Sequence, residues 1–374
     1  MTTVAYRWTE PKDVDMDRVA TLLGPSIAAN QFTNDGPGTR ALAAFLHTRM
    51  RLPEDRTVLT AASGTAALHA LVAGYNIVHG RALTWATQAM TFPSAVLGPL
   101  RGSVVVDNDP VHHGPSLEAL EAVRHTVDGV VVTNMFGFLC NVQVYEAWCR
   151  AHGKLLLFDN AATPMSFIEG TNSCAAGDGA FISLHETKPW GRGEGGAVVC
   201  PTGAVAAAVH RAMNFGFHYG QQVRVSHAES SNWRMSDIAA AFIQSHIETL
   251  EASDTYSRVA AILAAVDEYL HTAPDTRLQW GVTPTATVFP ACLFLRVRTE
   301  WPPVDVDTVS AFAAAIGIEA KQYYVPLTPP AAAPVAWAWY SRVVCLPLHW
   351  KTGTGPEAVA NVRALDTFLA GRWP

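Results

Sequence analysis

The chain of 374 residues has a net charge of −6, and 49% of its residues are hydrophobic while only 16% are charged. This composition is typical of a globular protein with a large core and excludes a disordered chain. No basic cluster is present that would neutralise a phosphate backbone, and no apolar run reaches the length needed to span a bilayer, so neither nucleic acid nor a membrane is an expected partner.

The cysteines and the first residues indicate a cytoplasmic protein. Six cysteines are scattered along the chain without a C-x-x-C pair, which is typical of reduced thiols and not of a disulfide framework or a metal site. The stretch MTTVAYRWTEPKD lacks a basic region followed by an apolar core, so no signal peptide is expected. We therefore expect a cytoplasmic enzyme without a metal.

Short apolar runs alternate with helical patterns between residues 57 and 201. Strands are predicted in 57–64, 81–86, 102–109, 129–137, 154–160, 179–185 and 195–201, and helices in 65–75, 118–126 and 143–153. Such alternation indicates a mostly parallel sheet with helices on both faces.

The pattern changes after about residue 205. Helices are predicted in 204–215, 235–273, 305–317 and 355–371, with the second long and nearly unbroken, and one strand is predicted in 287–298. The expected fold class is therefore α/β, with a large domain (25–245) and a smaller C-terminal α+β domain (246–374). Residues 1–24 are expected to pack with the smaller domain.

Ser63, Gly64 and Thr65 stand where a predicted strand meets a predicted helix, in the stretch AASGTAALHAL (61–71). The free N–H groups and the positive end of the helix dipole at such a junction can bind an anion, and Gly64 permits close approach of the backbone. An ordinary N-cap formed by Ser63 or Thr65 would explain the same residues, so this motif alone does not establish a phosphate site.

Two further stretches carry candidate catalytic residues. KLLLFDNAATP (154–164) ends an apolar strand with Asp159, where open α/β sheets bind ligands, although Asp-Asn is also a common turn. SLHETKPWGRGEGG (183–196) places Lys188 between Ser183 and a glycine-rich run. A partly desolvated lysine can form a Schiff base, whereas a solvated loop lysine is the ordinary alternative. The chain thus carries, in order, an anion-binding helix start, a strand-end carboxylate and a lysine. An aldehyde cofactor requires such a set, with the helix start for its phosphate, the carboxylate for its pyridine nitrogen and the lysine for its aldehyde.

The ordered motifs resemble those of the DegT/DnrJ/EryC1/StrS sugar aminotransferases, which use pyridoxal 5'-phosphate (PLP) on the aspartate aminotransferase fold (fold type I). The resemblance covers roughly residues 34 to 347 and rests on the stretches NDGPGT, SGTAALHAL, AMTFPSA, LFDNAA, SLHETKPWGRGEGG, NFGF, SNWRMSDIAAAF, YYVPL and CLPLHW.

The resemblance implies a role for each matching residue of the cofactor site. Lys188 would form the Schiff base with PLP (the internal aldimine) and then move the proton between substrate and cofactor. Asp159 would keep the pyridine nitrogen protonated. Gly64, Thr65 and Ser183 would hold the phosphate.

Four more residues have weaker support. Phe92 would stack on the cofactor ring, although it could equally be an ordinary core aromatic. Asn232 would reach the phosphate of the neighbouring subunit's cofactor, which implies a homodimer with shared active sites, although a helix N-cap is the alternative. His185 and Tyr323 are candidates for the substrate side.

The implied function is ping-pong transfer of an amino group from an amino acid donor, glutamate or glutamine, to the keto group of a small molecule. The family's usual acceptor is a nucleotide-linked keto sugar, and some members act on other intermediates of antibiotic pathways. Retention of Lys188 favours transamination, because the related sugar dehydratases carry histidine there. Another PLP reaction, such as elimination or cyclisation, and a non-catalytic sensor that has kept the fold stay open.

The chain departs from the family pattern at Ala162, where Gln or His usually lies near the cofactor's phenolic oxygen. Asn160 or Asn134 would then make that contact, or the oxygen would meet water or substrate. The extra room beside Ala162 favours a substrate unlike the usual one.

Overall fold

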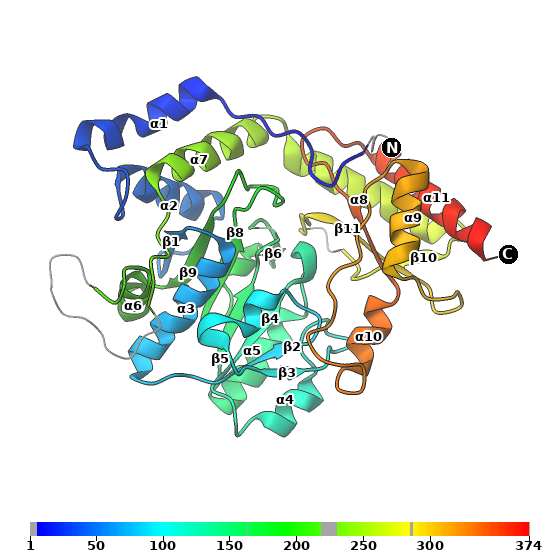
Figure 1. The fold of residues 1–374 in the computed structure, drawn as a ribbon, viewed down its shortest axis with the longest axis horizontal. Coiled ribbons are helices and arrows are strands. Elements are labelled where there is room, and N and C mark those ends of the chain that lie inside the picture. Colours follow the sequence, from blue (N-terminus) through cyan, green and yellow to red (C-terminus); the bar gives the residue numbers. More distant parts are fainter. Residues whose placement is uncertain (1–5, 163, 218–229, 285–286, 374) are drawn as a thin grey trace.

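The computed structural model describes residues 6–162, 164–217, 230–284 and 287–373 (Figure 1). A seven-stranded sheet of order β1-β9-β8-β5-β4-β2-β3 lies at its centre. Its strands are β1 (Arg56–Ala61), β2 (Trp85–Gln88), β3 (Val104–Val106), β4 (Gly129–Thr133), β5 (Leu155–Asp159), β8 (Gly179–Ser183) and β9 (Gly196–Pro201). Only β9 runs antiparallel to its neighbours β1 and β8, so the prediction of a mostly parallel sheet is confirmed.

Both faces of this sheet are buried. Successive residues of a strand point to opposite faces, so neighbours in one strand enter different cores. Val130 and Val132 of β4 belong to one hydrophobic core, while Val131 belongs to the other. The same alternation separates Leu156 from Leu157 in β5. The near-continuous apolar strands therefore follow from burial on two faces.

Different helices cover the two faces. α3 (Gly64–His79) and α6 (Ala204–Met213) pack against each other and form one core with the sheet. The other core takes residues from α2 (Pro37–Arg49), α4 (Leu117–Val123) and α5 (Val142–His152). The sheet is thus doubly covered, as its alternating sequence pattern predicts.

The expected long helix over 235–273 is wrong in one respect, since the chain forms two helices there. α7 (Asp237–Glu251) and α8 (Thr255–Thr272) are separated at Asp254, which has a left-handed φ of 50°. The hydroxyl of Ser253 donates to the carbonyl of Leu250 at 2.7 Å and helps to close the end of α7. Both helices bury apolar faces, so the hydrophobic period continues across a break that only local backbone geometry creates.

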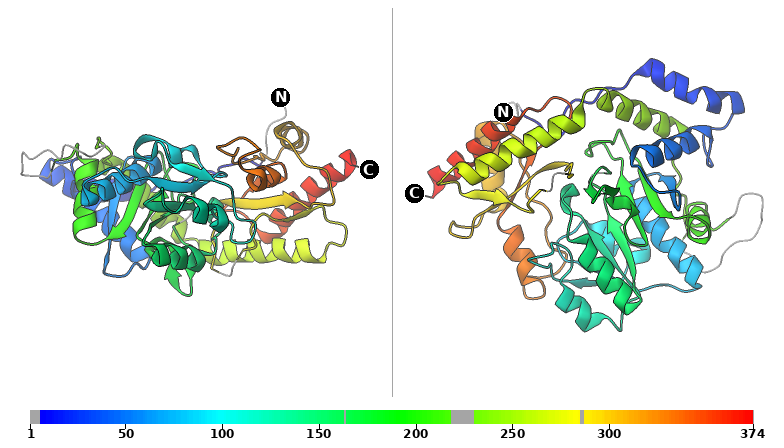
Figure 2. Two further views of the ribbon diagram at one scale, coloured as in Figure 1. Left: turned by 90° about the horizontal axis from the view of Figure 1, so that it is seen from below. Right: turned by 180° about the vertical axis from the view of Figure 1, so that it is seen from behind.

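The C-terminal part contains a second, smaller sheet. β10 (Leu278–Trp280), β11 (Cys292–Val297) and β12 (Val343–Pro347) pair antiparallel. The accompanying helices are α8, α9 (Val306–Ile316), α10 (Pro334–Tyr340) and α11 (Gly355–Arg372). Figure 2 shows these yellow-to-red elements gathered on one side of the molecule, which confirms the expected smaller α+β part. The predicted boundary after residue 245 falls inside α7, and the division into two domains stays a prediction.

The N-terminal segment begins beside the C-terminal elements and runs to the helices α7 and α2 of the large part (Figure 1). Tyr6 forms an isolated parallel bridge with Ile318, and the N–H of Trp8 donates to Glu319 at 2.8 Å. α1 (Met16–Ala29) then packs against α7 and α2. A two-stranded hairpin of β6 (Phe167–Ile168) and β7 (Thr171–Asn172) completes the fold. No helix in the described ranges is both long and apolar enough to cross a membrane.

Candidate active site

A cavity of about 520 Å³ opens where three parallel strands end. Thr133, Asp159 and Ser183 are the last residues of β4, β5 and β8, and all three line it. The carboxyl ends of parallel strands are where open α/β sheets bind ligands. Most of the residues predicted for the cofactor and substrate line this same cavity, namely Gly64, Thr65, Phe92, Asp159, Ser183, His185, Lys188 and Tyr323.

The N-terminus of α3 forms one wall of the cavity. Ser63 caps this helix, because its hydroxyl accepts the N–H of Ala66 at 3.1 Å. The N–H groups of Gly64 and Thr65 precede that bond and have no partner within the helix. A Cβ on Gly64 would lie 2.8 Å from the Cβ of Ser183, so only glycine lets α3 approach β8 this closely. The helix start is therefore both capped and open to an anion.

Asp159 is the buried carboxyl group of the cavity, with only 4% of its surface exposed. Its oxygens accept the N–H of Ala161 at 2.9 Å and the hydroxyl of Thr133 at 3.3 Å. Thr133 in turn pairs with the hydroxyl of Thr91 at 2.6 Å. Burial raises the pKa of Asp159, and the nearby Lys188 opposes that rise. A protonated pyridine nitrogen is the kind of cation that would offset the cost of burying this charge.

Lys188 lies in a tight loop between β8 and β9. Its N–H donates to the carbonyl of His185 at 2.8 Å, and its own carbonyl accepts the N–H of Gly191 at 2.9 Å. A Cβ on Gly191 would lie 1.9 Å from the carbonyl oxygen of His185, so this turn requires glycine. Burial lowers the pKa of Lys188, and Asp159 and Cys292 oppose the shift. The neutral amine that a Schiff base needs is thereby favoured.

Aromatic rings form the opposite wall. The Phe92 side chain is 49% exposed and meets the ring of Tyr324 edge-on at 5.8 Å, while Phe136 stacks on Tyr324 at 5.2 Å. Tyr323 meets the ring of Trp8 edge-on at 6.0 Å. Phe92 is thus an open cavity residue and not an ordinary core aromatic, and its predicted stacking on the cofactor stays a prediction.

Sequence reasoning missed several cavity residues. Trp8 and Thr133 line the cavity but belong to no motif that pointed to the site, while Thr91 and Tyr324 lie within the stretches AMTFPSA and YYVPL without having been singled out. The Tyr324 side chain makes no hydrogen bond to another described residue, and burial, reinforced by Asp159, raises the pKa of its hydroxyl well above the usual value. This phenol therefore stays protonated and can donate a hydrogen bond to a ligand. The signal that could have indicated Tyr324 is its place in the stretch YYVPL, next to the predicted Tyr323.

Ala162 lies on the cavity wall and is almost fully buried. It is the position where the departure from the family's motif predicts extra room. Asn160 does not line the cavity, whereas Asn134 does. The amide of Asn134 donates to Asn160 at 2.7 Å, and its oxygen accepts the N–H of Cys140 at 2.9 Å. Of the two expected donors, Asn134 is therefore the one that faces a ligand, with one amide hydrogen left.

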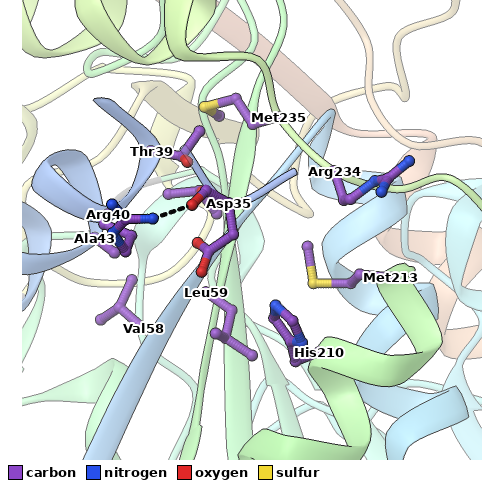
Figure 3. A pocket seen from close by; sticks show the side chains of 11 residues that line it. Asp35, Thr39, Arg40, Ala43, Val58, Leu59, His210, Met213, Arg234 and Met235 are labelled. Atoms are coloured by element: carbon purple, nitrogen blue, oxygen red, sulfur yellow. Dashed lines mark hydrogen bonds between the residues drawn. The ribbon is translucent and has the colours of Figure 1, made fainter. Parts of the chain in front are cut away.

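Asn232 does not lie in this chain's own cavity. It is exposed, and its side-chain oxygen accepts from Arg234 at 2.9 Å. Figure 3 shows a separate pocket of about 200 Å³ that Arg234 shares with Asp35, Thr39 and Arg40. The segments NDGPGT and SNWRMSD therefore meet at this second pocket, which shares no lining residue with the larger cavity.

The residues of the larger cavity fit the functional groups of an aldehyde cofactor: the helix start suits a phosphate, the buried carboxyl group of Asp159 a pyridine nitrogen, and the amine of Lys188, whose pKa is lowered by burial, an aldehyde. The fold and this cavity define a PLP-dependent enzyme with the aspartate aminotransferase fold. The sequence profile of the DegT/DnrJ/EryC1/StrS aminotransferase family matches residues 17–364, and the chain belongs to this family. It is an aminotransferase, and its cofactor is PLP.

Three relatives illustrate the similarity. A dTDP-4-amino-4,6-dideoxy-D-glucose transaminase of Shigella dysenteriae is 24% identical over 331 residues, which cover 85% of this chain and 87% of the relative. The structure of 3-amino-5-hydroxybenzoic acid synthase matches with a TM-score of 0.79 at 17% identity, covering 99% of this chain and 100% of that one. A Streptococcus pneumoniae protein described as a sugar aminotransferase, in its PLP form, matches with a TM-score of 0.78 at 18% identity, covering 98% and 99% of the two chains. The two structures support the fold alone.

Proposed function

We propose that this enzyme moves the amino group of an amino acid, glutamate or glutamine, to the keto group of a small molecule in two half-reactions. The observation that carries the proposal is the convergence of Lys188, Asp159 and the open start of α3 on one cavity. When bound, PLP supplies an electron sink that stabilises negative charge at the carbon of the amino acid that loses its proton.

The chain's own residues then have separate tasks. Asp159 would hold the proton on the pyridine nitrogen, and the burial that raises its pKa supports this role, because a nearby cation would stabilise the charged carboxylate. Lys188, with its lowered pKa, would take the proton from the amino acid and return it as a general base and acid. Gly64, Thr65 and Ser183 would bind the phosphate and so fix the cofactor in the cavity.

Lys321 is the other lysine or arginine among the described residues that line the cavity. Its ammonium lies 5.0 Å from the centre of the Trp8 ring and 3.3 Å from Glu319. We infer that it binds an anionic group of the donor or the acceptor at the cavity mouth. Lys321→Met should raise the half-saturating donor or acceptor concentration by about tenfold, the effect of one charge-assisted contact.

The half-reaction with an amino donor tests the function directly. Holoenzyme incubated with glutamate or glutamine should release the corresponding 2-oxo acid in amounts equal to the enzyme, with loss of the visible band of the lysine-bound cofactor. Lys188→Ala should abolish both signals. If neither donor, nor any other common amino acid, gives a 2-oxo acid while the cofactor is demonstrably bound, the protein performs another PLP reaction or acts as a sensor.

We propose a nucleotide-linked keto sugar as the acceptor, of the kind named for the Shigella dysenteriae relative, or another intermediate of an antibiotic pathway. The cavity supports either, because its aromatic wall of Trp8, Phe92 and Tyr323 offers flat apolar surface for a ring. Enzyme charged with the amino group should transfer it to a dTDP-linked 4-keto sugar. Transfer to a carbocyclic ketone alone would assign the acceptor to the second group.

We further propose a homodimer in which Asn232 completes the partner's active site. Asn232 is exposed and does not line this chain's own cavity, which supports the proposal. Mixing Lys188→Ala protein with Asn232→Asp protein under subunit exchange should restore about a quarter of the wild-type activity. Half of the dimers are then mixed, and each carries one intact site. No gain over the separate variants would contradict shared sites.

A further inference from the structure

A lysine from the N-terminal segment binds the loop that carries Lys188. The ammonium of Lys12 donates to the carbonyl oxygens of Glu186 at 2.7 Å, of Lys188 at 2.5 Å and of Gly191 at 2.5 Å. An ammonium group has three hydrogens, so these main-chain acceptors use its full capacity. The contacted residues bracket Lys188 on both sides.

The charges around Lys12 explain why it meets the backbone and not a carboxylate. The side chain of Glu186 is engaged by Arg192 at 2.8 Å and by the N–H of Gly193 at 2.7 Å. Burial lowers the pKa of Lys12 to about 8, while Glu186 and Glu10 favour its charged form and Arg192 disfavours it. A buried ammonium in that setting is stable when carbonyl oxygens surround it.

The N-terminal segment is itself held by the small C-terminal sheet and its helices. The N–H of Trp8 donates to Glu319, and Glu10 accepts the N–H groups of Lys351 and Thr352 at 2.9 and 3.1 Å. Lys12 therefore contacts the loop from a segment that is itself held by hydrogen bonds. A second contact to the loop comes from α7, where Nε2 of His246 lies 3.0 Å from the carbonyl oxygen of Pro189 and Nδ1 lies 3.3 Å from the carbonyl oxygen of Asp13 in the N-terminal segment.

We propose that Lys12 is a positioning residue for Lys188: by fixing the carbonyl oxygens on either side of residue 188, it sets the direction in which the Lys188 side chain enters the cavity. The inference rests on the proposed role of Lys188 as the residue that binds the cofactor. Holding a reacting group in one orientation raises its effective concentration, and supports behind the reacting group decide how well it is held.

The test compares Lys12→Met with the matched control Lys351→Met. Lys351 pairs with Asp13 of the same segment but does not touch the loop. Hydrogen exchange in the cofactor-free protein should be about tenfold or more faster for the amides of Lys188 and Gly191 in Lys12→Met, with no such change in the control. Covalent attachment of added PLP to Lys188, trapped by borohydride and located by mass spectrometry, should slow by about tenfold or more.

Two further readouts separate positioning from general structure. In Lys12→Met the rate constant of the donor half-reaction should fall while the half-saturating donor concentration stays the same. Lys12→Arg should restore part of the rate, because it keeps the charge but cannot place its planar group among three carbonyl oxygens equally well. If Lys12→Met does not fold, Lys12→Arg alone must show faster loop exchange at unchanged thermal stability.

Wild-type exchange and attachment in Lys12→Met, or equal changes in Lys351→Met, would overturn the proposal. Failure of the proposed function has a different signature. PLP would then attach equally well to Lys188→Ala protein, while the exchange measurement in cofactor-free protein would still report whether Lys12 holds the loop.

Discussion

Asp159→Asn should change the stability of the cofactor-free protein and its affinity for PLP in opposite directions. Asparagine keeps the shape of the side chain and can still accept the N–H of Ala161 while its amide meets the hydroxyl of Thr133. The substitution therefore removes a buried negative charge with little loss of packing. Any large effect must come from that charge.

The raised pKa of Asp159 determines whether the substitution stabilises or destabilises the cofactor-free protein. The folded state binds the proton more tightly than the unfolded chain, so this carboxyl lowers stability as the pH rises through and above the ordinary value of about 4. Asparagine does not ionise. The variant without cofactor should thus be more stable than the wild type at neutral pH, and this advantage should shrink as the pH falls towards 4.

With PLP bound, the effect of the substitution should be the opposite, because in the proposed function the carboxylate of Asp159 would pair with the protonated pyridine nitrogen. Removing one partner of a buried charge pair costs about 2–5 kcal/mol, which corresponds to roughly 30- to 4,000-fold weaker binding. Urea unfolding of cofactor-free protein at several pH values and titration with PLP, followed by tryptophan fluorescence, measure the two effects.

Asp178→Asn is the matched control. Burial also raises the pKa of Asp178, whose side chain accepts the N–H of Leu156 at 2.8 Å and does not line the cavity. Its substitution should change stability and leave the affinity for PLP unchanged. A cofactor-free Asp159→Asn protein that is less stable than wild type at neutral pH, or one that binds PLP as tightly, would refute the reasoning.

Three other substitutions test the remaining walls of the site. Gly64→Ala places a Cβ 2.8 Å from the Cβ of Ser183. Such overpacking costs about 1–3 kcal/mol, so PLP should bind about 5- to 150-fold more weakly. An unchanged preference for PLP over pyridoxal would argue against a phosphate-binding site at the start of α3. Thr133→Val leaves the buried hydroxyl of Thr91 without its partner at 2.6 Å and should lower the free energy of unfolding by about 1–3 kcal/mol, as measured in urea. Tyr324→Phe keeps the stacked ring, so thermal stability should hold while the pH at which the bound cofactor changes colour moves; an unmoved spectrum would exclude the Tyr324 hydroxyl from the site.

The strand-end residues of the site could be predicted from the sequence because the signals there are local. The apolar run of β5 stops at Asp159 and that of β8 at Ser183, and parallel strands bring such ends to one edge. The glycine turn before α3 carries its own capping signal. Each of these features lies within about ten residues of sequence, where periodicity and turn chemistry are informative.

Other features could not be predicted from the sequence, because they depend on contacts between segments that are far apart along the chain. β9 is as apolar as the parallel strands of the sheet, and nothing in its own residues shows that it runs antiparallel to its neighbours. Lys12 meets the loop of Lys188 across 176 positions of sequence. Tyr324 reaches the cavity from the chain between α9 and α10. A single sequence carries no local trace of such pairings, since they arise from the packing of the two sheets.

The departure at Ala162 changes where the polar contacts of the cavity come from. A Gln or His at this position would belong to the large sheet and would keep a constant distance from Asp159. Here the phenol of Tyr324 faces the same cavity from the smaller part of the molecule, with a raised pKa that keeps its proton in place. Its distance from Asp159 therefore depends on how the two parts of the molecule sit relative to each other. We propose that an acceptor with a bulky group beside Ala162 and an oxygen directed at Tyr324 suits this lining, so that the smaller part of the chain would help to select the substrate.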